Sequence, residues 1–239
     1  LKQTKEVARR AVCLSNFRQI NLAWVLYSNE SGGWYPGCLD PDTVWSWPPD
    51  NTLKHTYLSK LLPVMGETPD HLMEDNVWRC ASDSDYYTRM EGNPYRYIYF
   101  KGSYGTNMWL LGGNAGSGGG DWNKHYMKIS TVTLPPSTRI LMADNYDRNE
   151  ERARITGVDH WSGCFTSGYF DHWDTTDYFY KYLGVTSPHL DTTCVLWLDG
   201  HASAEQMELI VSDDNWNEIA EEFWLRRPSP DIWYPGSGG

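Results

Sequence analysis

Histidine and aspartate residues in the C-terminal part of the chain form its clearest candidate for chemistry. His189 is followed, after nine residues, by Asp199-Gly200-His201. Imidazole and carboxylate groups bind metal ions, so His189, Asp199 and His201 could supply three ligands to a metal-dependent hydrolase. A structural role also fits, because Asp-Gly between two extended runs marks a β-hairpin turn. We expect the structural role and no enzymatic activity, since nucleophile motifs such as G-x-S-x-G and H-E-x-x-H are absent from the sequence.

Acidic side chains form a second candidate site in the segment 171–177. Asp171, Asp174 and Asp177 would place carboxylate oxygens along one loop, and such hard oxygen ligands suit calcium. The segment does not match the EF-hand pattern, and a solvated acidic loop explains the same residues without a metal. Calcium is therefore the one cofactor that the sequence suggests, and both interpretations stay open.

Tryptophans in predicted loops form a third candidate. A flat aromatic face on a loop can stack on a sugar ring or on a protein partner while its polar edge stays in water. The same side chains can instead pack the loops onto the core, and we favour this interpretation. The loop tryptophans are Trp34, Trp45, Trp47, Trp122, Trp161 and Trp173.

The composition limits the classes of function. The chain has 239 residues, 40% of them hydrophobic, which is enough for a packed core in one or two domains. Its net charge of −11 argues against a nucleic-acid partner, because phosphate binding requires clustered lysine and arginine. The longest apolar run, 22–27, is far shorter than the ~20 residues of a membrane span. Residues 1–239 therefore contain neither a span nor a signal peptide.

The most regular part of the sequence predicts a long N-terminal helix over 2–28. Apolar residues from Cys13 to Tyr27 recur at intervals of three and four, which is a helical period. The polar and glycine-rich run 29–33 predicts the end of this helix. Polarity falls from residue 20 onward, so we expect the second half to be buried and the first half to be more exposed.

The remaining pattern predicts short strands, long aromatic-rich loops and one late helix. We expect a short helix at 56–62 stopped by Pro63, an extended segment at 77–80, strands at 95–104 and 139–143, a hairpin at 193–204 with a two-residue Asp199-Gly200 turn, and a C-terminal helix at 212–227. The first hairpin strand is apolar on both faces, which predicts a central position in the sheet. An insertion occupies about 144–185. Strands and helices do not alternate, so the pattern favours an α+β fold with an antiparallel sheet.

Four stretches of the chain, taken in order, resemble one family of bacterial proteins. They are residues 8–20, residues 78–83 (Trp-Arg-Cys-Ala-Ser-Asp), residues 136–144 (Pro-Ser-Thr-Arg-Ile-Leu-Met-Ala-Asp), and His189 with Asp199-Gly200-His201. The family is that of prepilin-type, pseudopilin-like proteins with an H-X9-DG domain, of the planctomycete and verrucomicrobial type. The second stretch differs from the family's Cys-Pro-Ser-Asp element in having Ala81 in place of proline.

The resemblance implies a pilin-like fold, in which a long N-terminal helix packs on an antiparallel sheet. Residues 1–31 would continue a membrane helix removed ahead of Leu1, and 32–239 would form the globular domain, held outside the cytoplasmic membrane. The implied function is a non-enzymatic subunit or accessory of a type II secretion or type IV pilus-like assembly. Its partners would be the membrane and other pilin-like subunits, which contact the helix. The alternative is a binding module on the same scaffold for carbohydrate or a secreted partner.

The five cysteines are Cys13, Cys38, Cys80, Cys164 and Cys194. None of them forms a C-x-x-C pair, which disfavours a zinc ribbon or a thioredoxin-like site. Cys13 and Cys80 both fall in the family-like stretches, and disulfides are the default outside the cytoplasm. The resemblance therefore suggests a Cys13–Cys80 disulfide, with two buried thiols as the alternative. Cys194 is expected to be a buried residue of its strand.

Overall fold

A computed structural model describes residues 2–37, 57–84, 86–87, 103–111, 127–132, 135–144, 164–165, 188–190 and 192–206. Two predicted features lie outside these residues. They are the C-terminal helix at 212–227 and, apart from its first residue and residues 164–165, the insertion at about 144–185.

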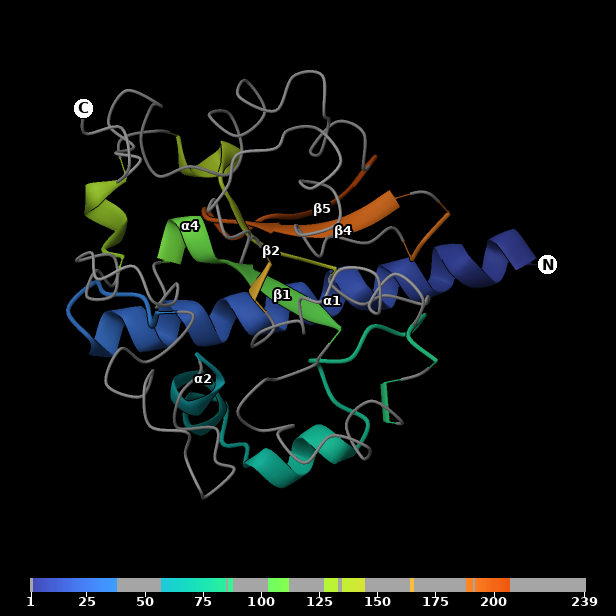
Figure 1. Ribbon diagram of the computed structural model, residues 1–239, viewed down its shortest axis with the longest axis horizontal. Helices are drawn as coiled ribbons and strands as arrows, with labels where there is room; N and C mark the ends of the chain where they lie inside the picture. Colours follow the sequence, from blue (N-terminus) through green and yellow to red (C-terminus); the bar gives the residue numbers. More distant parts are fainter. Residues whose placement is uncertain are drawn as a thin grey trace, which may run out of the picture.

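The N-terminal helix α1 spans Lys2–Glu30, as predicted. Gly32 and Gly33 end it with φ angles of +65° and +88°, values that glycine adopts without strain, and the Gly33 N–H donates to Ser28 O at 2.7 Å. Its buried stripe consists of Cys13, Asn16, Phe17, Ile20, Ala23, Trp24 and Ser28. The residues before Cys13 are exposed or half-buried, as predicted. The second half is buried only along this stripe, because Leu22, Val25 and Leu26 are exposed. Figure 1 shows the N-terminal turns projecting beyond the rest of the described structure.

The strands form one sheet in the order β3-β1-β2-β4-β5. The strands are β1 Tyr104–Asn107, β2 Ile140–Asp144, β3 Cys164–Phe165, β4 Thr192–Trp197 and β5 Ala202–Gln206. Neighbours among β1, β2, β4 and β5 are antiparallel, whereas the two-residue β3 runs parallel to β1. The α+β class and the central position of the first hairpin strand, β4, are therefore confirmed. The prediction of a strand at 95–104 is tested only at its end, where β1 begins at Tyr104.

The hairpin between β4 and β5 has a longer turn than the predicted two-residue Asp199-Gly200 turn. The Trp197 N–H donates to His201 O at 2.9 Å, which leaves three residues in the loop. The Gly200 N–H donates to Trp197 O, and Gly200 alone in this loop has a positive φ, of +92°. A three-residue loop with a left-handed glycine at its last position is a common hairpin connection. The hairpin is confirmed, but the expectation of a two-residue turn is wrong.

Two predictions near the helix α2, Leu58–Val64, need correction. Pro63 does not stop this helix but lies inside its last turn. The segment 77–80 forms turns instead of an extended piece. The cause is Asn76, whose side chain accepts the Trp78 N–H and donates to the carbonyls of His71, Leu72 and Glu74. An asparagine that binds neighbouring backbone groups in this way overrides the strand preference of valine and tryptophan.

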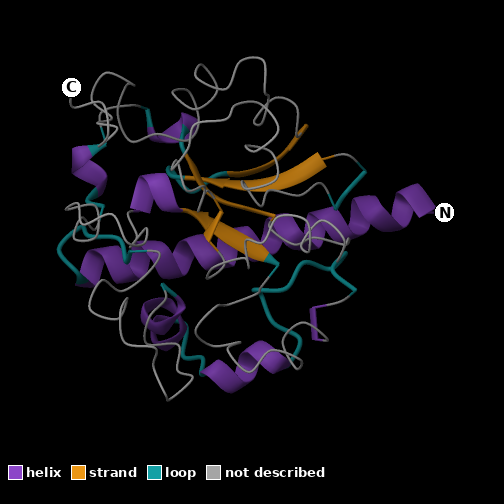
Figure 2. Ribbon diagram, in the orientation of Figure 1, coloured by secondary structure: helices purple, strands orange, loops and turns teal. Residues whose placement is uncertain are grey.

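The core lies where α1 contacts the sheet and α2. In Figures 1 and 2, α1 runs between the strands on one side and α2 on the other. Trp24 stacks between Tyr35 and Tyr57, at ring-centroid distances of 5.5 and 5.7 Å, and its Nε1 donates to Met142 Sδ in β2. The remaining described elements are the short helix α4, Met108–Leu111, and 3₁₀ turns at Pro69–Met73, Ile129–Thr131 and Pro136–Thr138.

Among the described residues, no helix combines the length and the apolar character that a membrane crossing requires, and this includes α1.

Candidate functional site

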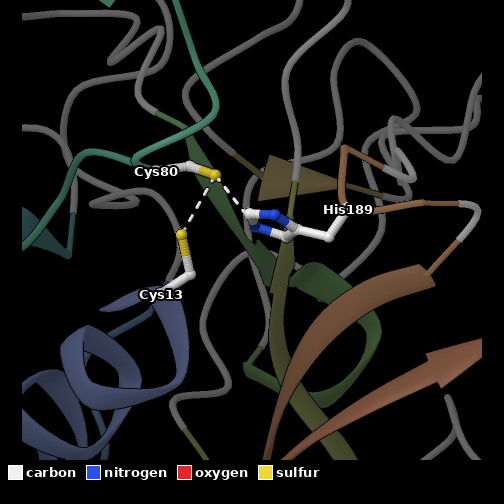
Figure 3. Close-up of side chains that lie close together, drawn as sticks. All are labelled: Cys13, Cys80 and His189. Atoms are coloured by element: carbon white, nitrogen blue, oxygen red, sulfur yellow. Dashed lines mark hydrogen bonds between the residues drawn. The ribbon is translucent and has the colours of Figure 1, made fainter. Parts of the chain in front are cut away.

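A buried cluster of two cysteines and a histidine lies between α1 and the sheet. Cys13 Sγ and Cys80 Sγ are 3.1 Å apart, and Cys80 Sγ is 3.3 Å from His189 Nε2 (Figure 3). Both cysteines are fully buried and His189 is 1% exposed. Figure 3 shows the three side chains approaching from α1, from the loop around Cys80 and from the turn before β4.

Local hydrogen bonds fix each of these three residues. The Asp83 N–H donates to Cys80 O and closes a tight turn, while Asn16 in α1 donates to Arg79 O at 3.0 Å. His189 and Thr192 exchange two backbone hydrogen bonds, and Leu190 between them has a φ of +54°. The left-handed backbone conformation of a leucine costs roughly 1–2 kcal/mol, so contacts with surrounding residues must stabilise this turn.

The second nitrogen of His189 faces polar groups. Its Nδ1 lies 3.2 Å from Ser82 Oγ, and that hydroxyl donates to Glu6 Oε2 at 2.7 Å. The single hydroxyl hydrogen of Ser82 is used toward Glu6, so Ser82 Oγ accepts from His189 Nδ1–H. A neutral His189 then has its lone pair on Nε2, the atom that faces Cys80.

Two further titratable residues reach His189 from the sheet. The ligand atoms of Asp144, Cys194 and His189 all lie within 4.8 Å of one another, as do those of Cys13, Cys80 and His189. Asp144 ends β2 and is fully buried, and its Oδ2 accepts the Cys194 N–H at 2.5 Å. Its Oδ1 has no hydrogen-bond partner in the part of the chain that the structure describes.

Burial makes negative charge costly in this cluster. It raises the pKa of Asp144 and of the Cys80 and Cys194 thiols well above their ordinary values. The hydrogen bond with Cys80 has the opposite effect on Cys13 and lowers the pKa of that thiol to about 5.

The interpretation of His189, Asp199 and His201 as joint metal ligands is wrong. His189 lies in the buried cluster, whereas Asp199 and His201 stand together at the exposed hairpin turn, with Nδ1 of His201 2.6 Å from Oδ1 of Asp199. The His201 ring stacks on Trp197 at 5.3 Å, and Gly200 forms the turn. The motif therefore divides into a turn and a separate buried histidine.

The other predicted sites are placed only in part. Trp34 is 45% exposed, and Lys128 Nζ lies 5.8 Å from its ring centroid. Trp45, Trp47, Trp122, Trp161 and Trp173 lie outside the described residues, as do the calcium candidates Asp171, Asp174 and Asp177.

Cys13 and Cys80 are neighbours in space, but they are not bonded. Neither forms a disulfide in the structure, and neither does Cys194, which is fully buried on β4 as expected. The sequence analysis missed Asp144 and Cys194 as members of the cluster, and Glu6 and Ser82 as the groups behind His189. Asp144 and Ser82 carried a signal, because each lies in one of the four family-like stretches.

Each of those four stretches contributes one residue to the cluster. Cys13 comes from residues 8–20, Cys80 from 78–83 and Asp144 from 136–144, while His189 opens the last stretch. In comparisons with known proteins, no family model, no curated protein and no solved structure matches this chain.

Proposed function

We propose that this protein is a non-enzymatic, pilin-like subunit or accessory of a type II secretion or type IV pilus-like assembly. In this role α1 is the surface that packs on the helices of neighbouring pilin-like subunits. The observation that carries the proposal is a second apolar face on α1. This face consists of Val7, Val12, Leu22, Val25 and Leu26, whose exposed fractions range from 39% to 58%.

The helical period places most of this face opposite the buried stripe. At 3.6 residues per turn, Leu22 lies almost half a turn around the axis from Ile20, which is fully buried. Val7 and Val25 lie on the same line of the helix, five turns apart. The exposed polar residues Ser15, Arg18 and Gln19 separate Val7 and Val12 from the apolar group at 22–26. A helix that needed only to cover its own sheet would be polar at 22–26 as well, so this group supports a helical partner.

Charge supports the same arrangement. The basic residues of α1 are Lys2, Lys5, Arg9, Arg10 and Arg18, whereas the chain as a whole has a net charge of −11. The remainder of the chain is therefore more acidic than the whole. Opposite charges on α1 and on the body of a neighbouring copy would favour their approach and would fix its direction.

Membrane anchoring is a further part of the proposal. The resemblance to prepilin-type proteins supports a cleaved leader and a hydrophobic helix ahead of α1, with the globular part outside the cytoplasmic membrane. The encoded residues upstream of Leu1 test this part. We expect a short charged leader, a glycine at the cut site and about 20 apolar residues, and a conventional cleavable signal peptide would contradict the anchored arrangement.

Substitution on the exposed face of α1 tests the packing role. In the full-length protein in its membrane, we expect Leu22→Asp to abolish cross-linking between two differently tagged copies, because it buries a charge in an apolar contact. Ser137→Asp is the matched control, since it adds the same charge at an exposed position outside α1. If the Leu22→Asp protein cross-links as well as wild type while both variants keep the wild-type melting temperature, α1 is not the contact surface.

A further inference from the structure

We propose that Cys13, Cys80, His189 and Asp144 bind one divalent zinc-like ion in the interior of the protein. The donor set would be two thiolate sulfurs, one imidazole nitrogen and one carboxylate oxygen. Zinc accepts these ligand types in four-coordinate structural sites, and thiolate with imidazole disfavours calcium and magnesium. The site would join α1, the loop around Cys80, the end of β2 and the turn before β4. It does not depend on the pilin-like role.

The distances among Cys13, Cys80 and His189 suit a metal after small movements. Two thiolates on one tetrahedral zinc lie about 3.8 Å apart, given a Zn–S distance of about 2.3 Å. Cys13 Sγ and Cys80 Sγ are 3.1 Å apart, so an entering ion would need to separate them by less than an ångström. A disulfide bond would need them to approach by about an ångström, to 2.05 Å.

The polar contacts of His189 match those of a metal-bound histidine. Such a histidine binds the metal with one nitrogen and donates its other N–H to an oxygen group. His189 directs Nε2 toward Cys80 Sγ and Nδ1 toward Ser82 Oγ, with Glu6 behind that hydroxyl. The lone pair of Nε2 is therefore available at the atom that the site requires.

Backbone donors already point at both sulfurs. The Ala81 N–H donates to Cys13 Sγ at 3.3 Å, and the Ser82 N–H donates to Cys80 Sγ at 3.4 Å. Hydrogen bonds of this kind stabilise sulfur in its thiolate form, which is the form that binds metal. A buried pair of thiolates needs such support, and a bound cation would supply more.

Asp144 offers the fourth ligand. It is fully buried, and its Oδ1 lacks a hydrogen-bond partner among the described residues, although an unpartnered buried oxygen normally costs 1–3 kcal/mol. The ligand atoms of Asp144 and His189 lie within 4.8 Å of each other. A cation beside His189 would give this oxygen a partner and would compensate for its charge.

Cobalt substitution tests the site, because tetrahedral Co²⁺ bound to thiolates absorbs visible light. We expect the full chain, purified under reducing conditions, to take up one Co²⁺ with charge-transfer absorption typical of two thiolates, and one Zn²⁺ to displace it. Cys13→Ser, Cys80→Ser and His189→Gln should each lose stoichiometric binding. Asp144→Asn, which removes the carboxylate ligand, should bind at least 10-fold more weakly. Ser82→Ala, which removes the group that orients His189, should also bind at least 10-fold more weakly.

The control is Cys194→Ala, which removes the neighbouring thiol that we do not assign as a ligand. It should keep the stoichiometry and the two-thiolate spectrum. Loss of one thiolate from its spectrum would contradict the assignment of Asp144. Far-ultraviolet circular dichroism of every variant separates loss of the site from loss of the fold.

The whole proposal is overturned if the reduced, folded protein takes up no Co²⁺ or Zn²⁺. It is also overturned if protein purified without reductant has a Cys13–Cys80 disulfide by peptide mass spectrometry and does not bind metal after reduction.

Discussion

Gly200 shows how a single residue couples the hairpin turn to the helix. Its φ is +92°, and a Cβ at this position would stand 2.4 Å from Asn21 Nδ2 in α1. The backbone angle therefore favours glycine, and a side chain at this position would also have to displace the Asn21 amide in α1. This contact gives a structural reason for the Asp199-Gly200 element of the motif.

We expect Gly200→Ala to lower the free energy of unfolding by about 2–3 kcal/mol, measured by urea denaturation. Gly66→Ala is the matched control, because Gly66 has a φ of +71° but nothing lies within 4 Å of its added Cβ. This control should cost about 1–2 kcal/mol, from the backbone angle alone. Asn21→Ala should recover part of the loss at Gly200, and equal losses for the two glycines would show that the approach to α1 is unimportant.

At the scale of elements, α1 has two faces with different roles. Trp24 on the inner face is fully buried between two tyrosine rings and β2, whereas Leu22 on the outer face is 58% exposed. The inner face stabilises the fold, and in our proposal the outer face serves assembly. The two faces can therefore be separated by substitution.

We expect Trp24→Ala to destabilise the protein by about 3–5 kcal/mol, because it leaves a large cavity in the core. Leu22→Ala on the same helix should change the free energy of unfolding by no more than about 0.5 kcal/mol, since that side chain is largely exposed. Thermal or urea denaturation of the isolated protein measures both. Similar losses for the two variants would contradict the division of α1 into a packing face and a free face.

Periodicity in the sequence was enough to predict α1, β2 and the β4–β5 hairpin, because each has a long or strongly patterned apolar signal. The prediction of an extended segment at 77–80 was wrong, because the Asn76 side chain binds neighbouring backbone groups and forms turns. The prediction that Pro63 stops its helix was also wrong, because the last turn of a short helix tolerates proline. The buried cluster was harder to predict from the sequence than these elements. Its residue types were visible, but only the resemblance placed Cys13 near Cys80, and spacing alone wrongly joined His189 to Asp199 and His201.

At the scale of the whole molecule, the cluster connects segments that are far apart in the chain. Cys13 and Cys80 are separated by 67 residues, and Cys80 and His189 by 109. Closing loops of this length costs conformational entropy, and sequence patterns within a short window carry no information about which loops close. A link at this point would therefore restrict the unfolded chain strongly.

If the ion binds as proposed, it should stabilise the native state by mass action. Free Zn²⁺ at about 1,000 times its dissociation constant would add about 4 kcal/mol to the free energy of unfolding. A chelator should therefore lower the melting temperature of the zinc-loaded, reduced protein, and it should leave the melting temperature of the His189→Gln variant unchanged. An equal response of the two proteins to the chelator would show that the stabilising metal binds elsewhere.

The position of Cys13 and Asn16 along α1 has a mechanical consequence. The N-terminal end of α1 projects beyond the described body in Figure 1. The Ser82–Glu6 hydrogen bond, the cluster and the Asn16–Arg79 hydrogen bond attach the helix ahead of Trp24. Tension applied at the projecting end of α1 would reach these contacts before it reached the aromatic core around Trp24. They lie beside the helix, so the load would act on them in shear, and several bonds would have to yield together. In the proposed assembly, a molecule drawn along its own helix would thus resist extraction at mid-helix.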